Sequence, residues 1–178
     1  MRNLSFQIRP RGRYNLFMSL QEIDEFWMRE AMRAAVEAGQ RDEVPIGACL
    51  IDKEGSLLAA AGNKTRLLCD PTAHAEILVL RDAAAKIGNY RLTETTLYTT
   101  IEPCAMCAGA LVQARVERLV FAALDERFGA VETHFRICDS SSLNHRMEIT
   151  SGVLAEECRK LMQDFFRARR LEKRRVAD

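Results

Sequence analysis

The sequence has no apolar run near the ~20 residues that a membrane-spanning helix needs, although 48% of its 178 residues are hydrophobic. A membrane span is therefore excluded. An apolar stretch followed by a small-residue cleavage site is also lacking near the N-terminus, so we expect no secretory signal. Disulfides are then not expected among the six cysteines, and we expect a cytoplasmic protein. Closely spaced cysteines become candidates for metal or redox chemistry.

Net charge is also nearly absent, at +1, but the charges are unevenly distributed. Residues 1–18 contain four Arg and no acid, and residues 165–175 contain six Lys or Arg and one Glu. The rest of the chain is therefore acidic, and the concentrated basic ends indicate a local anionic partner. Residues 1–18 are interpreted as a disordered arm, a transit peptide or an over-long start before Met18, and residues 19–178 as one domain.

The periodicity of apolar residues predicts strands that alternate with helices. A capping box at Ser19 and Glu22 predicts a helix start, and Asp70 with Pro71 predicts another. Helices are expected over residues 19–39, 69–88, 104–116 and 151–175, and strands over 44–52, 55–63, 95–103 and 118–124. This alternation predicts an α/β fold, a three-layer α/β/α sandwich around a mixed sheet of about five strands. The long loop 125–145 is expected to be functional.

Histidine is scarce, with three in the chain, yet His74 lies two residues before Glu76 in the apolar run "PTAHAEILVL". A buried glutamate is unfavourable unless it is paired, so either this helix faces solvent or the two residues share a function. Cys104 and Cys107 of "EPCAMC" lie on the first turn of another helix, where the dipole and free amides favour thiolates. Helix starts that follow strands commonly meet at one sheet edge, so His74, Cys104 and Cys107 could hold a catalytic zinc with one open position.

Glu76 lies roughly 200° around the helix from His74, so it is not expected to bind the same ion. It could instead move the proton of a metal-activated water. Taken singly, the cysteine pair could be a redox site and the His-x-Glu pair a coincidence. Together they match the H-x-E…P-C-x-x-C signature of zinc deaminases.

Longer stretches resemble the bacterial tRNA-specific adenosine deaminases. These are "DEVPIGACL", "DPTAHAEILVLRDAAAKIGNYRL", "TLYTTIEPCAMCAGALVQARVERLVFAALD" and "NHRMEITSGVLAEECRKLMQDFFRARR", and the resemblance covers about residues 20–172. It implies a cytidine-deaminase-like fold, one Zn²⁺ per subunit, a homodimer, and conversion of adenosine to inosine at the wobble position of an arginine tRNA. Loop 125–142 departs from the family pattern, which leaves its RNA contacts open.

The resemblance also implies roles for individual residues. Glu76 would be the catalytic proton carrier, and Asn63 would bind the purine edge; the alternative for Asn63 is a turn residue. Pro45, Ile46 and the backbone near Ala75 would form the pocket wall. Asp125 would lie near a neighbouring nucleotide, or else be an ordinary loop acid.

The last helix gives a separate argument for RNA. An apolar stripe is followed by Phe166 at its edge and then by Arg167, Arg169 and Arg170. An edge aromatic among arginines suits the unpaired bases of an anticodon loop, whereas the alternative is a solvated helix end whose cations complement the dipole. The stripe itself consists of Leu154, Cys158, Leu161, Met162 and Phe165.

Three functions therefore remain open from the sequence. The first is a tRNA adenosine deaminase, and the second is a deaminase of a free base or nucleoside such as guanine, cytosine or cytidine. The third is a non-catalytic zinc or redox module that binds RNA. His134 and His145 are expected to be polar loop residues and not ligands, and the other cysteines are expected to be small hydrophobes or loop thiols.

Overall fold

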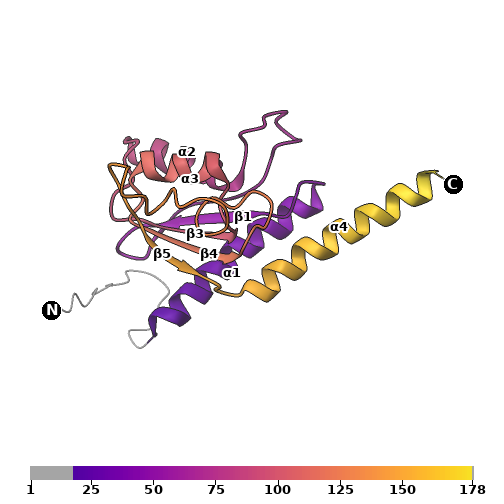
Figure 1. Cartoon of the computed structure of the whole chain (residues 1–178), viewed down its shortest axis with the longest axis horizontal. Coiled ribbons are helices and arrows are strands. Elements are labelled where there is room, and N and C mark those ends of the chain that lie inside the picture. Colours follow the sequence, from indigo (N-terminus) through magenta and orange to yellow (C-terminus); the bar gives the residue numbers. More distant parts are fainter. Residues whose placement is uncertain (1–17, 178) are drawn as a thin grey trace.

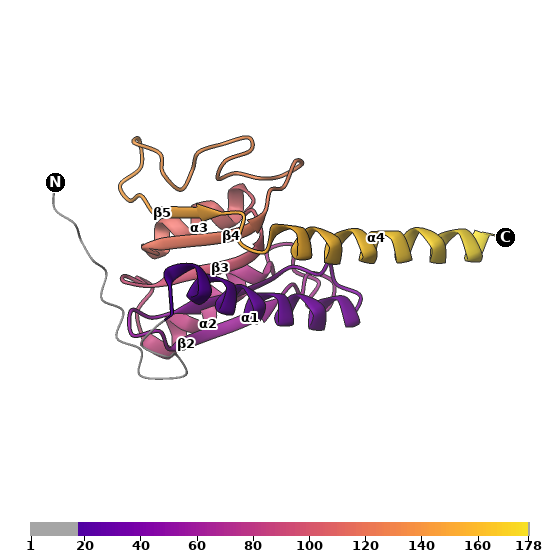
Figure 2. The ribbon, with the colours of Figure 1, turned by 90° about the horizontal axis from the view of Figure 1, so that it is seen from below.

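A five-stranded sheet lies between two layers of helices (Figure 1). In chain order the elements are α1 (Leu20–Gln40), β1 (Gly47–Ile51), β2 (Leu57–Gly62), α2 (Ala75–Ile87), β3 (Thr96–Ile101), α3 (Ala105–Ala114), β4 (Arg118–Ala123), β5 (Glu148–Ser151) and α4 (Ala155–Ala177). Helices α1 and α4 cover one face of the sheet, while α2 and α3 cover the other (Figure 2). The predicted three-layer α/β/α sandwich is confirmed.

The computed structural model describes residues 18–177. The basic arm expected over residues 1–18 lies outside the described residues, apart from Met18. Within the described part, no helix is both long and apolar enough to cross a membrane.

The strand order is β2-β1-β3-β4-β5, with β1 antiparallel to its two neighbours and β3, β4 and β5 parallel to one another. Side chains alternate between the two layers: Cys49 and Ile51 pack with α1, whereas Ala48 and Leu50 pack with α2 and α3. Parallel strands place their carboxyl ends at one edge, where α/β sheets commonly bind ligands. The segments after β3 and β4 therefore meet at this edge.

The first helix starts as its capping box predicts. The Ser19 hydroxyl accepts a hydrogen bond from the Glu22 N–H, and the Glu22 carboxylate accepts one from the Ser19 N–H at 2.7 Å. The helix then buries a row of small alanines against the sheet. A Cβ at Gly62, where β2 ends, would lie 2.3 Å from the carbonyl oxygen of Ala34, so a residue without a side chain is required there. This close approach fixes the position of the next residue, Asn63.

The expected start of the second helix is wrong. The helix begins at Ala75 with His74 as its N-cap, not at Asp70 and Pro71. The Asp70 carboxylate accepts from the N–H and the hydroxyl of Thr72, at 2.8 and 2.7 Å. Such local bonds compete with helix capping, so residues 70–73 form a turn.

The strand pattern also missed β5, which is short and only partly buried. It follows a long connection without regular secondary structure between β4 and β5, and this contains the loop 125–145 that the sequence singled out.

A buried ion pair joins the α1 layer to the sheet. Both nitrogens at the end of the Arg118 guanidinium donate to the Asp24 carboxylate at 2.7 Å, and the Tyr98 hydroxyl donates to it at 2.9 Å. The side chains of Asp24 and Arg118 are 4% and 12% exposed. Removal of one partner from such a pair leaves the other charge buried and unpaired.

We therefore expect Asp24→Ala to lower the free energy of unfolding by about 3–5 kcal/mol. The control is Glu25→Ala at the next position of the same helix, which breaks a solvent-exposed pair with Arg29. It should change the free energy of unfolding by less than about 1 kcal/mol. Urea unfolding of both variants measures the difference, and equal losses would contradict this assignment.

Candidate active site

The structure brings together the three side chains that the sequence singled out as ligands. His74 is the N-cap of α2 and Cys104 the N-cap of α3, and neither side chain makes a capping hydrogen bond. The His74 Nδ1 atom lies 3.7 Å from the Sγ of Cys104 and 3.5 Å from that of Cys107. All three ligand atoms lie within 4.8 Å of one another. One imidazole nitrogen and two thiols at this spacing match the donor set that zinc prefers.

The thiols are electrostatically coupled. A hydrogen bond with Cys107 lowers the pKa of Cys104 to about 4, and a weaker contribution comes from the hydrogen bond with His74. The thiolate of Cys104 raises the pKa of the Cys107 thiol, which is also buried. The hydrogen bond with Cys104 raises the pKa of His74. A divalent cation would favour deprotonation of all three, because metal ligands must shed their protons.

Glu76 lies beside this cluster on the first turn of α2. It is 2% exposed, and its Oε2 atom has no hydrogen-bond partner among the described residues. Burial raises the pKa of its carboxyl group to about 7. A buried carboxylate oxygen without a partner indicates a site for a missing polar group, because the large majority of buried polar atoms are bonded.

Asn63 connects the end of β2 to the start of α2. Its Oδ1 atom accepts a hydrogen bond from the Ala75 N–H at 2.8 Å, and its own N–H donates to the Ile46 carbonyl at 3.0 Å. Pro45 is buried next to Ile46. The two hydrogen bonds link three of the predicted substrate residues, Ile46, Asn63 and Ala75, and the side-chain NH₂ group of Asn63 remains a potential donor.

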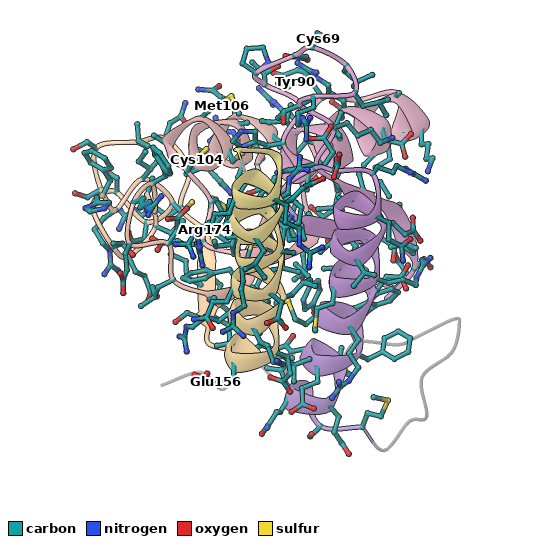
Figure 3. The ribbon with its side chains drawn as sticks, turned by 90° about the vertical axis from the view of Figure 1, so that its right-hand side faces the viewer. Cys69, Tyr90, Cys104, Met106, Glu156 and Arg174 are labelled. Carbon is teal, nitrogen blue, oxygen red and sulfur yellow. The ribbon has the colours of Figure 1, made fainter. Side chains whose placement is uncertain are left out.

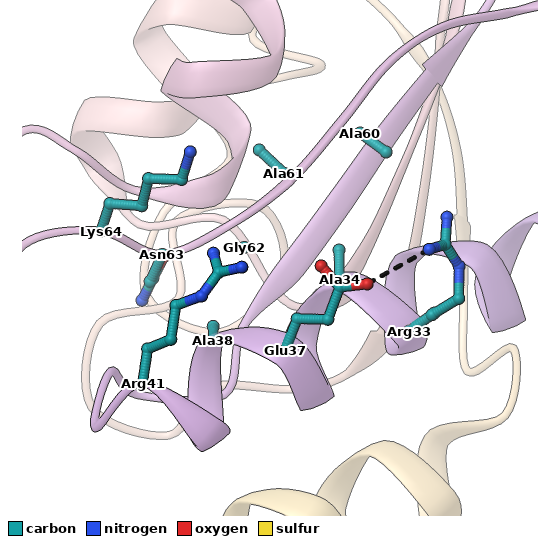
Figure 4. Close-up of a pocket in the computed structure, with 10 residues that line it drawn as sticks. All are labelled: Arg33, Ala34, Glu37, Ala38, Arg41, Ala60, Ala61, Gly62, Asn63 and Lys64. Carbon is teal, nitrogen blue, oxygen red and sulfur yellow. Dashed lines mark hydrogen bonds and ion pairs between the residues drawn. The ribbon is translucent and has the colours of Figure 1, made fainter.

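A hollow of about 120 Å³ lies between α1 and the end of β2 (Figure 4). Its lining includes Arg33 from α1, Arg41 just after it, and Asn63 and Lys64 after β2. Arg33 is already paired with two glutamates on its own helix. Asn63 is the one predicted site residue in this lining, and His74, Cys104 and Cys107 are not part of it. The hollow therefore adjoins the site but does not include the ligand cluster.

Two buried glutamates hold the loops that flank the site, and the sequence analysis missed both. Glu43 accepts from the backbone N–H groups of Arg66 and Leu67, at 2.9 and 2.7 Å to Oε1, and from the Thr65 hydroxyl. Glu102 does the same for the loop after β4. Glu102 lies in the largely apolar stretch "TTIEPCAM", where an acid needs partners, and this signal could have identified it. Glu43 follows three polar residues, and no comparable signal marks it.

The loop after β4 contains Asp125, His134 and His145, for which the sequence analysis made predictions. The Asp125 Oδ1 atom accepts from the N–H groups of Arg127 and Phe128, so this side chain closes a turn. The imidazoles of His134 and His145 are bonded to backbone carbonyls, and neither lies in the ligand cluster. As expected, these two histidines are loop residues and not ligands.

The last helix begins at Ala155 and not at residue 151, because Ser151 ends β5 and Leu154 has a positive φ of 53°. Leu154 therefore precedes the helix, and the predicted apolar stripe runs along α4 from Cys158. Cys158 is buried and Phe165 half-buried, whereas Phe166 is 41% exposed at the edge. Figures 1 and 2 show the carboxyl-terminal half of α4 projecting beyond the sheet. In Figure 3, α1 and α4 lie side by side, with Glu156 near the start of α4 and Arg174 near its far end.

The arginines of this helix differ in their surroundings. Arg167 and Arg170 are exposed. Arg169 instead forms an ion pair with Asp42, a residue just after α1, with 3.2 Å between nitrogen and oxygen. Its guanidinium carbon also lies 5.8 Å from the centroid of the Phe165 ring. Arg169 therefore attaches α4 to the end of α1, a role that the sequence analysis did not assign.

Comparison with known proteins agrees with this geometry. The profile of the MafB19-like deaminase family matches residues 23–170. The tRNA-specific adenosine deaminase of Haemophilus influenzae is 47% identical over 86% of this chain and 88% of its own length, and that of Bacillus subtilis is 43% identical over 85% and 93%.

The chain belongs to the tRNA-specific adenosine deaminase family.

Solved structures place the family within a wider fold. A structure from work on A-to-I editing by tRNA:A34 deaminases at the wobble position of transfer RNA superposes with a TM-score of 0.74 at 43% identity, over 76% of this chain and 98% of that one. A guanine deaminase from Nitrosomonas europaea superposes with a TM-score of 0.70 at 26% identity, over 79% and 83%. The predicted resemblance and fold class are thus confirmed.

Proposed function

We propose that this protein deaminates adenosine to inosine hydrolytically at the wobble position of a tRNA anticodon. The observation that carries the proposal is the convergence of His74, Cys104 and Cys107 beside Glu76, whose Oε2 atom has no hydrogen-bond partner among the described residues. The printed names of the relatives supply the substrate class, adenosine in tRNA. The net reaction adds one water at C6 of the base and releases the amino group as ammonia.

We infer that His74, Cys104 and Cys107 hold one Zn²⁺ ion. Three protein ligands with an open fourth position are the arrangement of catalytic zinc, whereas structural zinc is closed by four. Zinc bound there would supply the Lewis acidity that makes a water nucleophilic near neutral pH. Zinc also suits the mixed nitrogen and sulfur donors of this cluster.

Glu76 would carry the protons of the reaction. A pKa raised to about 7 by burial allows its carboxyl group to accept and to return a proton near neutral pH. Its free Oε2 atom would take a proton from the attacking water. The same atom would pass this proton to the ring nitrogen, and would then take the proton of the hydroxyl added at C6 and deliver it to the departing amino group.

The purine would be oriented by Asn63. Because Oδ1 is occupied by the Ala75 N–H, the Nδ2 group of Asn63 is the part that can donate to an acceptor on the purine edge. Pro45 and Ile46 would form an apolar wall beside it. Asp125, at the carboxyl end of β4, would face a neighbouring nucleotide.

The tRNA would contact α4 as well. Phe166 presents an exposed ring on which an unpaired base can stack, and Arg167 and Arg170 are exposed cations for the phosphate backbone. From the family resemblance we also propose an arginine tRNA as the substrate, a homodimer as the assembly and the cytoplasm as the location.

A deaminase of free guanine is the second candidate, because the guanine deaminase of Nitrosomonas europaea shares the fold. Identity favours the tRNA enzymes, at 43–47% against 26%. The basic helix also favours RNA, since a free base has no backbone to neutralise. Incubation of the protein with an A34 anticodon stem-loop and, separately, with free guanine, cytosine and cytidine distinguishes the two. Inosine in the stem-loop is expected, and turnover of free bases alone would contradict the proposal.

Glu76→Gln should retain zinc and lose deamination by on the order of 10²-fold or more, because the general acid and base is removed while the ligands remain. Asp82→Asn, the matched acid-to-amide change at an exposed position of the same helix, should leave turnover intact. Inosine is measured by mass spectrometry of the digested stem-loop. Unchanged turnover in Glu76→Gln would favour a non-catalytic RNA-binding module.

Cys107→Ser should abolish stoichiometric zinc binding, because only two of the three ligands remain. Cys69→Ser, at an exposed cysteine outside the cluster, should retain one zinc ion per chain. Elemental analysis after gel filtration measures the metal. Equal zinc in the two variants would contradict the ligand assignment.

The double variant Arg167→Ala/Arg170→Ala should weaken stem-loop binding about tenfold and reduce its salt dependence. Arg29→Ala/Arg159→Ala removes the same charge from arginines of α1 and the start of α4 and serves as the control. Fluorescence anisotropy at several salt concentrations measures both. Equal weakening in the two proteins would indicate that only net charge matters.

A further inference from the structure

Glu102 is a buried carboxylate whose hydrogen bonds all go to a single loop. Its Oε1 atom accepts from the backbone N–H groups of Val131, Glu132 and Thr133 at 3.0, 2.7 and 2.9 Å. Its Oε2 atom accepts from the Asp125 N–H at 3.1 Å and from the Thr133 hydroxyl. With 1% of its surface exposed, Glu102 interacts with this loop and not with solvent.

The loop packs directly on this carboxylate and on the start of α3. A Cβ at Gly129 would lie 2.2 Å from the Glu102 Oε2 atom, so only a glycine permits the approach. The Ala130 N–H donates to the Pro103 carbonyl at 2.9 Å, and Gly129 forms a backbone bridge with Cys104. The same segment that contacts Glu102 is thus bonded to a ligand residue of the cluster.

We propose that Glu102 is a positioning residue that fixes residues 125–133 as one wall of the substrate site. It would fix the position of Asp125, which is proposed to face a neighbouring nucleotide, relative to Cys104, which is proposed to bind the metal. This role in catalysis rests on the proposed function. The ordering of the loop itself depends only on the hydrogen bonds above.

The bonding pattern requires a carboxylate. Three successive N–H groups converge on one oxygen as in an anion-binding nest, and the second oxygen accepts two further donors. A glutamine has only one acceptor oxygen, so its NH₂ group would face donors in either orientation. Charge-assisted bonds are also about twice as strong as neutral ones. Glutamine at position 102 is therefore expected to release the loop despite its equal size.

The principal test is Glu102→Gln in the full-length, zinc-loaded protein. We expect faster amide hydrogen exchange at residues 131–133 and a KM for the anticodon stem-loop raised about tenfold or more, the order expected when such bonds are lost. The zinc content per folded chain and most of kcat should be retained, because the ligands and Glu76 are untouched. A merely structural role would instead reduce the amount of folded, zinc-loaded enzyme and leave KM unchanged.

The matched control is Glu54→Gln, the same change at an exposed side chain in the turn between β1 and β2, at the opposite edge of the sheet. It should behave as the unmodified protein, since Glu54 lies outside the loop and its hydrogen bonds. Gly129→Ala tests the contact from the loop side and should also raise KM. Its control, Gly109→Ala in α3, places the new methyl group in open space and should not.

Thr133→Val removes a single hydroxyl donor and covers the case in which Glu102→Gln does not fold. Raised exchange and KM in Thr133→Val and Gly129→Ala then support the proposal. The proposal is overturned if Gly129→Ala leaves both hydrogen exchange and KM unchanged, and if Glu102→Gln does the same. Thr133→Val takes the place of Glu102→Gln if the latter does not fold. If the unmodified protein forms no inosine, the proposed function fails, while the exchange data alone still decide whether Glu102 orders the loop.

Discussion

The structure depends on two helices whose amino-terminal ends meet at one edge of the sheet. His74 caps α2 and Cys104 caps α3, and both side chains are free of capping bonds. The imidazole nitrogen and the two sulfurs therefore lie within 4.8 Å of one another. Hydrogen bonding between the two thiols lowers the pKa of Cys104 and raises that of Cys107, so the two ligands are not equivalent. The chemistry of the donor set and the position of Glu76 both follow from this meeting point.

Each flank of the site is held by a buried carboxylate that accepts backbone hydrogen bonds. Glu43 orders the turn after Asn63, and Glu102 orders the loop after β4. Loops cannot otherwise bury their N–H groups without loss of stability. The two acids thus allow irregular segments to keep a fixed conformation. Under the proposed function these segments would be walls of the substrate site, where small displacements are costly in rate.

The layers, the family and the ligand cluster could be predicted from the sequence, because each depends on short motifs or on periodicity. In this chain His-x-Glu and Pro-Cys-x-x-Cys each lie at a helix start, where the helical spacing sets how the side chains of one motif are oriented to one another. The start of α2 was misplaced because the Asp70 carboxylate bonds locally to Thr72, which a capping pattern does not reveal. Glu102 and the Arg169–Asp42 pair were missed because their partners are distant in sequence and only the tertiary structure brings them together.

Zinc-edge X-ray absorption of the purified protein tests the centre most directly, since it counts the atoms around the ion without an activity assay. The account predicts two sulfur neighbours at about 2.3 Å, one nitrogen at about 2.0 Å and one further light atom in an open fourth position. A shell of four sulfurs, or a metal-free protein that still converts adenosine to inosine, would contradict it.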